Sequence, residues 1–471
     1  MIHYLQEWPL FNKRLLVISV LLFLFTISCE DLGKKKVLED RPFQTTFKVE
    51  DFRPAEECKP CHPIYYKEWA ASMHAYSMSD PVWFKFQQGA QTAHKAIGEE
   101  IGDFCIQCHS PVAALTNAIT DHENLTIEES VNLPPQIKDG VTCDVCHTVT
   151  HLPQSTNIET GTQTYETADF KLYIDGTRYG ILSDPEENPF HQSGYHAGYD
   201  QSEFCRNCHN LTVNGIDAEV TSSEWENSAF KAMGSECQTC HMPVYEGYAA
   251  EGSPLRQNLH RHYFPGIGTS TTGDSLNAFL KPAIADILDR SAEVNLFESL
   301  SDTISSTSPL IIKVIVTNNT GHNFPSGVPF TRQLWLEVKV SVDGDTLFQS
   351  GYLNDDGDLY DFHIDPNHEI DPQLALFNSI LYNSEGDSGV GVEYMTRMND
   401  YTLPVSGSRV VNYVVDLPSL VPAGGSEITI SLRLLLRAFP PFLFRNLNLL
   451  DEMNRLIIWE IDSNIASAIL E

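Results

Sequence analysis

Five short segments of this 471-residue chain repeat the pattern Cys-x-x-Cys-His, and together they use ten of its eleven cysteines. Even one such segment is expected by chance only ~0.01 times in a chain of this composition. The repeated cysteine pairs are Cys58 and Cys61, Cys105 and Cys108, Cys143 and Cys146, Cys205 and Cys208, and Cys237 and Cys240.

The spacing of each segment matches the chemistry of covalent haem attachment. Two thiols three positions apart can add to the two vinyl groups of a protoporphyrin, and the adjacent histidine then binds the iron from one side. We therefore predict five covalently attached haem c groups. Their proximal iron ligands would be His62, His109, His147, His209 and His241.

Two other uses of paired cysteines fit the sequence less well. Zinc sites need cysteine pairs that combine into four-ligand sets, and an odd number of pairs, each followed by histidine, has no natural partition. Disulfides suit exported proteins, but a fixed two-residue gap repeated five times is a poor way to crosslink a long chain.

The segment from Cys58 to His241 is short for five cofactors. The apolar porphyrin faces must then supply much of the interior, so we expect a mainly α-helical or irregular cytochrome domain over residues 54–270. Haems held by so little polypeptide must be near neighbours, which is the arrangement of an electron-transfer chain.

Other histidines are candidates for the second axial position of each iron. His74 follows His62 by twelve residues, about 18 Å along a continuous helix, so it would serve a neighbouring haem and not its own. His262 and His322 lie in segments rich in Gly and Pro, and His191 precedes the fourth motif. The principal distal candidates are thus His74, His191, His262 and His322, and the secondary ones are His94 and His196.

Several of these segments resemble the cytochrome c554-like multihaem family. The likeness is carried by the run from Cys58 to His74, by Gly140-Val141, and by the His-Met-Pro that ends the last motif. The segments around His262 and His322 are similar to those of members with a C-terminal sandwich domain, so the likeness covers about residues 54–440. It implies mainly bis-histidine haems and electron transfer outside the cytoplasm. Two departures are a fifth haem motif and a long insert between His147 and Cys205.

The N-terminus has the order of an export signal. Lys13 and Arg14 precede an apolar run, and small residues then lead to the lone Cys29. Residues 1–28 resemble a bacterial lipoprotein signal with Cys29 as the lipidated residue, and residues 29–53 read as a tether. A spanning helix is the alternative, but the apolar stretch is shorter than the roughly 20 residues that a bilayer requires. We expect a lipoprotein anchored to a membrane, in the periplasm or at the cell surface.

The second half of the chain has a different pattern of apolar and polar residues. Residues 276–287 have helical periodicity, and β-branched or alternating runs follow at 310–316, 333–342, 347–351, 410–415 and 428–436. We predict a helical linker over 271–305 and an all-β, immunoglobulin-like sandwich over 306–440. Residues 441–471 show mixed spacing and suggest no role.

The net charge restricts the classes of partner that the protein can bind. Thirty Lys and Arg residues against 63 Asp and Glu give a net charge of −33, which repels a nucleic-acid backbone and favours redox partner proteins with basic docking surfaces. The predicted function is a pentahaem cytochrome that relays electrons. The alternatives are a multihaem oxidoreductase that acts on a small nitrogen or sulfur compound at an open axial position, and a subunit of a cytochrome filament.

Overall fold

The computed structural model describes residues 45–471 except 97, 99–100, 123–124, 153–157, 161–170, 214, 274–275, 362–369, 393–394 and 418–424. The predicted signal, Cys29 and most of the predicted tether lie outside the described residues. Within the described ranges, no helix is both long enough and apolar enough to cross a bilayer.

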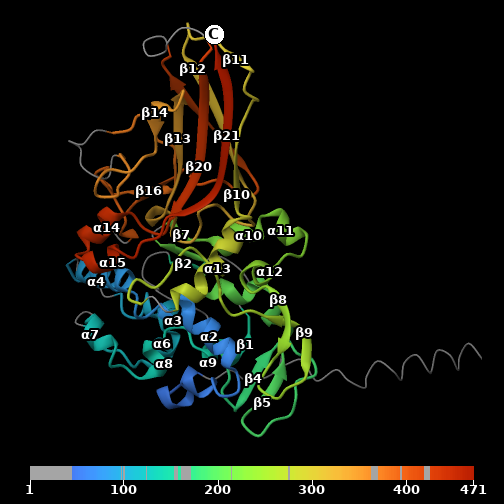
Figure 1. Cartoon of the computed structure of the whole chain (residues 1–471). Helices are drawn as coiled ribbons and strands as arrows, with labels where there is room; N and C mark the ends of the chain where they lie inside the picture. Colours follow the sequence, from blue (N-terminus) through green and yellow to red (C-terminus); the bar gives the residue numbers. More distant parts are fainter. Residues whose placement is uncertain are drawn as a thin grey trace, which may run out of the picture.

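Two regions follow one another along the length of the molecule (Figure 1). We call residues 45–270 the N-terminal region and residues 292–471 the β region. The first contains short helices and small hairpins, and the second consists mostly of strands that run to a tip near the C-terminus. The predicted order, a helical part followed by a β part, is confirmed, while the immunoglobulin-like type of the sandwich stays a prediction.

Most helices of the N-terminal region are short, and four of its helices begin with proline. The fixed backbone angle of proline suits a first turn, where its missing N–H is not needed. The α-helices are α2 (Pro63–Ala71), α3 (Met73–Tyr76), α4 (Pro81–Ala96), α5 (Ile106–His109), α6 (Pro111–Thr116), α7 (Ile127–Ser130), α8 (Pro135–Lys138), α9 (Cys143–His147), α10 (Thr221–Glu226), α11 (Ala229–Ala232) and α12 (Cys237–His241). The 3₁₀ helices are η1 (Val49–Asp51), η2 (Ala55–Glu57), η3 (Ala197–Asp200) and η4 (Ser202–Asn207).

The strands of this region form two- and three-stranded sheets in the orders β1-β3, β4-β5, β2-β6-β7 and β8-β9. They are β1 (Val149–His151), β2 (Ile158–Thr160), β3 (Lys171–Leu172), β4 (Thr177–Gly180), β5 (Gln192–Tyr195), β6 (Leu211–Val213), β7 (Ile216–Glu219), β8 (Val244–Tyr248) and β9 (Leu255–His260). Most of them lie in the insert after the third motif or in the hairpins that follow the fourth and fifth motifs.

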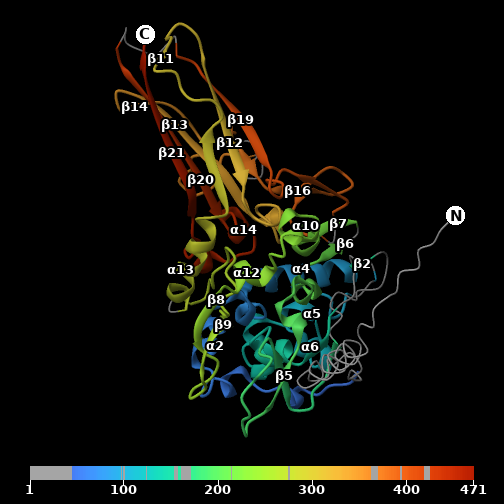
Figure 2. The ribbon, with the colours of Figure 1, turned by 90° about the vertical axis from the view of Figure 1, so that its right-hand side faces the viewer.

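The β region contains two larger sheets, ordered β10-β12-β19 and β11-β21-β20-β13-β14. Figure 2 shows β12 and β19 in one layer and β13, β20 and β21 in the other. The longer strands are β10 (Ala292–Leu296), β12 (Leu310–Asn318), β13 (Gln333–Val342), β14 (Asp345–Ser350), β19 (Ser408–Val415), β20 (Glu427–Arg437) and β21 (Trp459–Leu470). The shorter elements are β11 (Thr303–Ile304), β15 (Leu376–Phe377), β16 (Ser379–Tyr382), β17 (Ser388–Gly389), β18 (Arg397–Asp400), η5 (Pro329–Thr331), α14 (Pro441–Asn446) and α15 (Leu450–Met453).

One hydrophobic core lies between these two sheets. Alternate residues of β12 and β20 point into it, as the period-two pattern of a half-buried strand requires. Ala71 of α2 and three residues of α13 (Asn277–Leu288) join the same cluster, so the core reaches the N-terminal region. The two regions therefore pack as one molecule.

Three features differ from the sequence-based expectation. The helical linker is helical only over α13, because residues 292–296 pair with β12 as β10. Residues 441–471 supply β21, which pairs with β20 along most of its length. The helix expected to continue to His74 stops at Ala71, because Ser72 takes an extended conformation and its hydroxyl bonds the carbonyl of Trp69 at 2.7 Å.

Candidate haem sites

Each cysteine motif forms a tight turn that gathers its functional side chains. Three of the motifs show the bond that makes this turn, from the histidine N–H to the carbonyl of the first cysteine: His62 to Cys58 at 2.8 Å, His109 to Cys105 at 3.3 Å and His209 to Cys205 at 3.1 Å. The third and fifth motifs are the helices α9 and α12 themselves. All ten motif cysteines are half-buried, and none is in a disulfide.

Four of the five proximal histidines face a second histidine at nearly the same separation. Each partner is one of the four principal distal candidates. The ring centroids are 6.3 Å apart for His62 and His191, 6.3 Å for His209 and His74, 6.2 Å for His147 and His262, and 6.3 Å for His241 and His322.

This separation fits two imidazoles on opposite sides of one metal ion. With metal–nitrogen bonds of ~2 Å, the ring centroids of two opposed ligands are roughly 6 Å apart. The rings are not in close face-to-face contact at this distance, and the pairs leave room for an atom between them. The residues present therefore fit iron porphyrins with bis-histidine ligation.

The far nitrogen of these rings is held by the protein. A backbone carbonyl lies within hydrogen-bonding distance of Nδ1 in most of them, and because a carbonyl only accepts, Nδ1 carries the proton and Nε2 is free to bind metal. The pairs are His62 with Ala249 (2.7 Å), His109 with Ser77 (3.1 Å), His147 with Tyr179 (2.6 Å), His241 with Pro265 (2.8 Å), His191 with Gln192 (3.0 Å), His262 with His260 (3.0 Å) and His322 with Asn323 (2.7 Å).

Burial favours the neutral form of four of these imidazoles. It lowers the pKa of His74 and of His262 to about 3, and the pKa of His109 and of His241 to about 4. Neutral imidazole is the form that coordinates a metal, so no proton has to be displaced near neutral pH.

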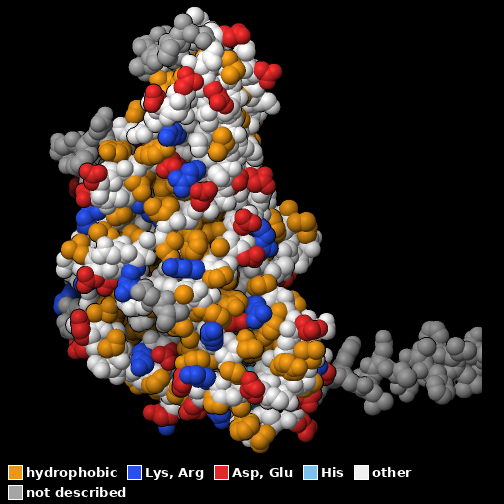
Figure 3. Space-filling view, in the orientation of Figure 1, with side chains coloured by type: hydrophobic (Ala, Val, Ile, Leu, Met, Phe, Trp, Pro, Cys, Tyr) orange, Lys and Arg blue, Asp and Glu red, His pale blue; other side chains and the backbone are white. Residues whose placement is uncertain are grey.

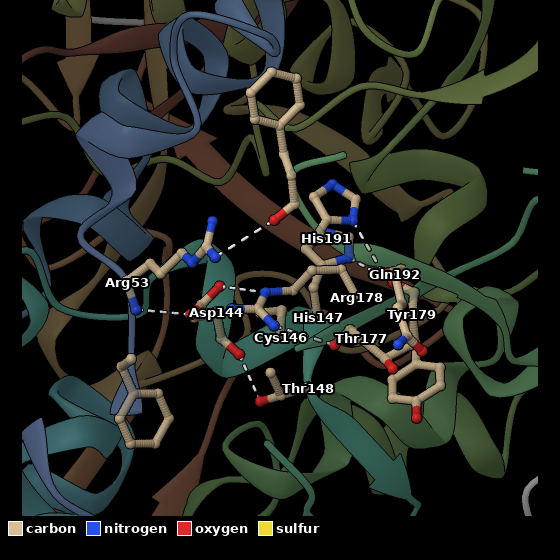
Figure 4. A network of polar contacts seen from close by, with 12 residues as sticks. Arg53, Asp144, Cys146, His147, Thr148, Thr177, Arg178, Tyr179, His191 and Gln192 are labelled. Atoms are coloured by element: carbon tan, nitrogen blue, oxygen red, sulfur yellow. Dashed lines mark hydrogen bonds and ion pairs between the residues drawn. The ribbon is translucent and has the colours of Figure 1, made fainter. Parts of the chain in front are cut away.

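The third motif is anchored by the network in Figure 4. Asp144, inside the motif, receives two hydrogen bonds of 2.7 Å from the Arg178 guanidinium and a third from the backbone N–H of Arg53. The next residue of β4, Tyr179, provides the carbonyl that orients His147. A buried bidentate ion pair of this kind fixes the relative orientation of the two side chains as well as balancing their charges.

The same insert carries His191 to the first motif. The side chain of Asn188 accepts hydrogen bonds from the backbone N–H groups of Phe190 and His191, and the Phe190 carbonyl accepts from Arg53 at 3.4 Å. These contacts close a turn just before β5 and present His191 opposite His62. The insert that departs from the family pattern thus contributes to a site.

His262 is set by a buried carboxylate on α2. Glu68 is 0% exposed, and it accepts hydrogen bonds of 2.7 Å from the Arg261 side chain and from the backbone N–H of His262. The helix that follows the first motif therefore positions the histidine that faces the third. Sequence reasoning assigned Glu68 no role, although a carboxylate beside Trp69 on a packed helix face was a signal.

His74 and His322 reach their partners from outside the motif that each one faces. The break at Ser72 starts the separate turn α3, which places His74 opposite His209 of the fourth motif, so its partner belongs to another motif as expected. His322 lies in the loop between β12 and β13, as expected, and Asn318 of β12 donates to its carbonyl at 2.8 Å. The β region thus completes the fifth site.

His109 differs from the other proximal histidines. In the described part of the chain its ring faces no second histidine, and Trp83 of α4 stacks on it with centroids 4.6 Å apart and planes inclined by 16°. Sequence reasoning did not single out Trp83. The secondary candidates join none of the four pairs: His94 lies near the end of α4, and both ring nitrogens of His196 bond backbone groups, of Thr150 and Gly198.

Comparison with known proteins finds one similar family and one similar fold. Residues 57–148 match the family described as cytochrome c554 and c-prime. A solved penta-heme cytochrome c552 from Thermochromatium tepidum superposes over 90% of this chain and 100% of its own, with a TM-score of 0.60 and 21% sequence identity. At that identity the likeness shows a shared fold, and this fold spans both regions.

Two further structures overlap only weakly. The first is the sporulation control protein Spo0M from Bacillus subtilis, with a TM-score of 0.17 and 10% identity over 38% of this chain and 49% of that chain. The second is the alkylpurine DNA glycosylase AlkC from Pseudomonas fluorescens, with a TM-score of 0.15 and 7% identity over 42% of this chain and 40% of that chain. No curated protein matches the sequence. Across residues 57–148 the chain thus resembles the cytochrome c554 and c-prime family, and over both regions it shares the fold of a solved penta-heme cytochrome.

Proposed function

We propose that the protein binds five haem c groups, one at each motif, and relays electrons between redox partners outside the cytoplasm. The observation that carries this proposal is the set of four histidine pairs with a common spacing of 6.2 to 6.3 Å. Iron with two protein ligands exchanges electrons without opening a position for substrate, which suits a carrier. When bound, the haems supply the redox chemistry, and the chain fixes their axial ligands and surroundings.

Contacts between motifs support a continuous path. The thiols of Cys58 and Cys143, of Cys205 and Cys237, and of Cys208 and Cys108 lie close enough to shift each other's pKa. In the loaded protein these sulfur atoms are the thioether links, so each contact sets two porphyrin edges side by side. The first motif is then next to the third, and the fourth is next to both the second and the fifth. Cys146 of the third motif also interacts electrostatically with Cys205 and Cys208 of the fourth, which joins the two groups.

The environment of the protein follows from its class. Proteins of the c type lie outside the cytoplasm, and we further propose that Cys29 carries a lipid anchor that holds the chain at a membrane surface. On the face in Figure 3, acidic side chains lie over both regions with basic ones scattered among them. With a net charge of −33, a partner with a basic docking surface would associate faster at low salt.

Intact mass and spectroscopy of the protein from a host that attaches haem c test the proposal. We expect the mass of five added haems and, by electron paramagnetic resonance (EPR), at least four low-spin irons that carbon monoxide does not alter. A chain without porphyrin, or with zinc in its place, would refute it. A chain in which most irons are high-spin would refute the relay.

A second candidate function rests on the site of the second motif. His109 faces no histidine within the described residues, so the haem at the second motif is the one where a small nitrogen or sulfur compound could bind iron. In this alternative the protein is an oxidoreductase with one reactive haem and four that supply electrons.

Carbon monoxide distinguishes the two candidates. The oxidoreductase predicts that one haem in five binds the gas, and that the response disappears in the double variant Cys105→Ala/Cys108→Ala, which lacks the second haem. The matched control, Cys58→Ala/Cys61→Ala, should keep the response. A protein with no carbon monoxide response would reject the oxidoreductase and leave the relay.

A further inference from the structure

The Nδ1 atom of one proximal histidine faces a side-chain carboxylate, whereas that of each other proximal histidine faces a backbone carbonyl. The Nδ1 atom of His209 lies 3.3 Å from Oε1 of Glu219, whereas the other four proximal rings face backbone oxygens. A carbonyl carries a partial charge and a carboxylate carries a full one. The fourth motif therefore differs in the charge behind its iron ligand.

The position of Glu219 is built into the fold. It ends β7, whose register with β6 sets it opposite Leu211, and β6 starts two residues after His209. This small hairpin turns back toward the motif that precedes it. The Glu219 side chain is 13% exposed, and a Cβ added at Gly327 of the β region would lie 3.4 Å from its Oε2. The carboxylate is thus enclosed between the two regions.

A carboxylate in this place changes the iron ligand electronically. By accepting the Nδ1–H bond it draws the proton toward itself, and the imidazole gains negative charge and becomes a stronger donor through Nε2. A stronger donor stabilises ferric over ferrous iron and lowers the reduction potential. The four haems with carbonyl partners lack this effect.

The same site has a second distinguishing feature. The planes of His74 and His209 are inclined by 59°, whereas the other three pairs are inclined by 19° to 26°. Each imidazole interacts with one iron d orbital according to its plane. Near-parallel rings act on the same orbital and split the pair widely, while strongly inclined rings act on both and split them less. The inclined site should therefore give the low-spin EPR signal with the largest g value.

We propose that Glu219 is a positioning residue that lowers the reduction potential of the haem held by His209 and His74. This inference rests on the proposed function, because it needs a bis-histidine haem at the fourth motif. That haem adjoins the haems of the second and fifth motifs. A haem of low reduction potential stays mostly oxidised, so electrons pass through it and reside on the neighbouring haems.

The test is a redox titration of the full-length, haem-loaded protein followed by EPR. In Glu219→Gln, which keeps the size of the side chain and removes its charge, we expect the midpoint of the largest-g signal to move to higher potential while the other signals stay in place. Asp217→Asn is the matched control, since Asp217 is an exposed carboxylate on the same strand that bonds Thr212. It should leave every midpoint unchanged.

Three results would overturn the inference: no shift in Glu219→Gln, an equal shift of all signals, or the same shift in Asp217→Asn. If Glu219→Gln binds fewer haems, Glu219→Asp keeps the charge at a greater distance and should give a smaller shift of the same signal. A parent protein without bis-histidine signals would refute the proposed function itself, which separates the two failures.

Discussion

The two regions of the molecule are stabilised in different ways. Within the described residues, the core shared by the two β sheets contains thirty buried hydrophobic residues, whereas the main cluster of the N-terminal region contains ten. Most helices of the N-terminal region have only four to six residues, too few to be stable alone. The comparison indicates that hydrophobic periodicity specifies the β region and that covalently bound cofactors specify the N-terminal region.

The largest expected effect follows from withholding haem. In a host without haem attachment, the N-terminal region should fail to fold, because the porphyrin faces and the iron bonds that join its short elements are missing. The β region should keep its strands. Limited proteolysis with mass spectrometry measures this as rapid cleavage before residue 270 and resistance after it. Equal resistance of both regions would remove the basis of the comparison.

A cavity in the core of the β region should have a smaller effect than the loss of haem, and it should destabilise the β region. Leu334 on β13 is 0% exposed, so Leu334→Ala should lower the free energy of unfolding by about 2–5 kcal/mol. Urea denaturation followed by far-ultraviolet circular dichroism measures the change. Ile311→Ala on β12 is the control, because Ile311 is 61% exposed and its loss should change stability little. Similar losses in both variants would contradict the assigned core.

The link between the regions should respond to removal of one imidazole. His322→Ala should convert one of the five haems from low-spin to high-spin and allow it to bind carbon monoxide, since the β region then no longer supplies its ligand. Optical difference spectra report this change. His196→Ala should have no such effect, because both nitrogens of that ring already bond backbone groups. A spin change in the His196 variant and none in the His322 variant would reverse the assignment.

The smallest effect concerns pH. Burial raises the pKa of Asp80, at the start of α4, from 3.8 to about 6. The folded carboxyl keeps its proton to higher pH than the unfolded one, so its contribution to stability falls as pH rises from about 4 to about 6 and is constant above that. Asp80→Asn, which keeps an acceptor for the N–H of Val82, should lack this decline.

Denaturation at pH 4 and pH 7 measures the difference between this variant and the parent protein. The exposed Asp286→Asn is the control and should follow the parent at both values. If the Asp80 variant also follows the parent, Asp80 titrates normally in the folded protein.

Sequence reasoning succeeded where a local pattern carries the information. The alternation in residues 310–316 and 428–436 predicted β12 and β20, because a half-buried strand has to show it. It missed β21, since several apolar residues of that strand, Ile465 and Ile469 among them, face solvent and obscure the pattern. It missed β10 because the strand directly follows a helix that suggested a linker.

The haem sites show the same limit. The Cys-x-x-Cys-His motifs are local and could be read directly, whereas the partner of each ring depends on tertiary contacts. The prediction that His74 serves another motif came from its distance along a helix that in fact breaks at Ser72. Trp83 and Glu68 contact histidines that are distant in sequence, and the contact of Glu219 depends on a strand register. No local sequence pattern predicts such contacts.

The place of His322 has a consequence for biogenesis. The cysteines of the fifth motif leave the ribosome well before His322 does. The loop that presents this histidine joins β12 of one sheet to β13 of the other, so it is shaped only after the two sheets have packed together. The last iron to acquire both ligands is therefore the one nearest the sandwich, and maturation of the cytochrome finishes only when its strands have assembled.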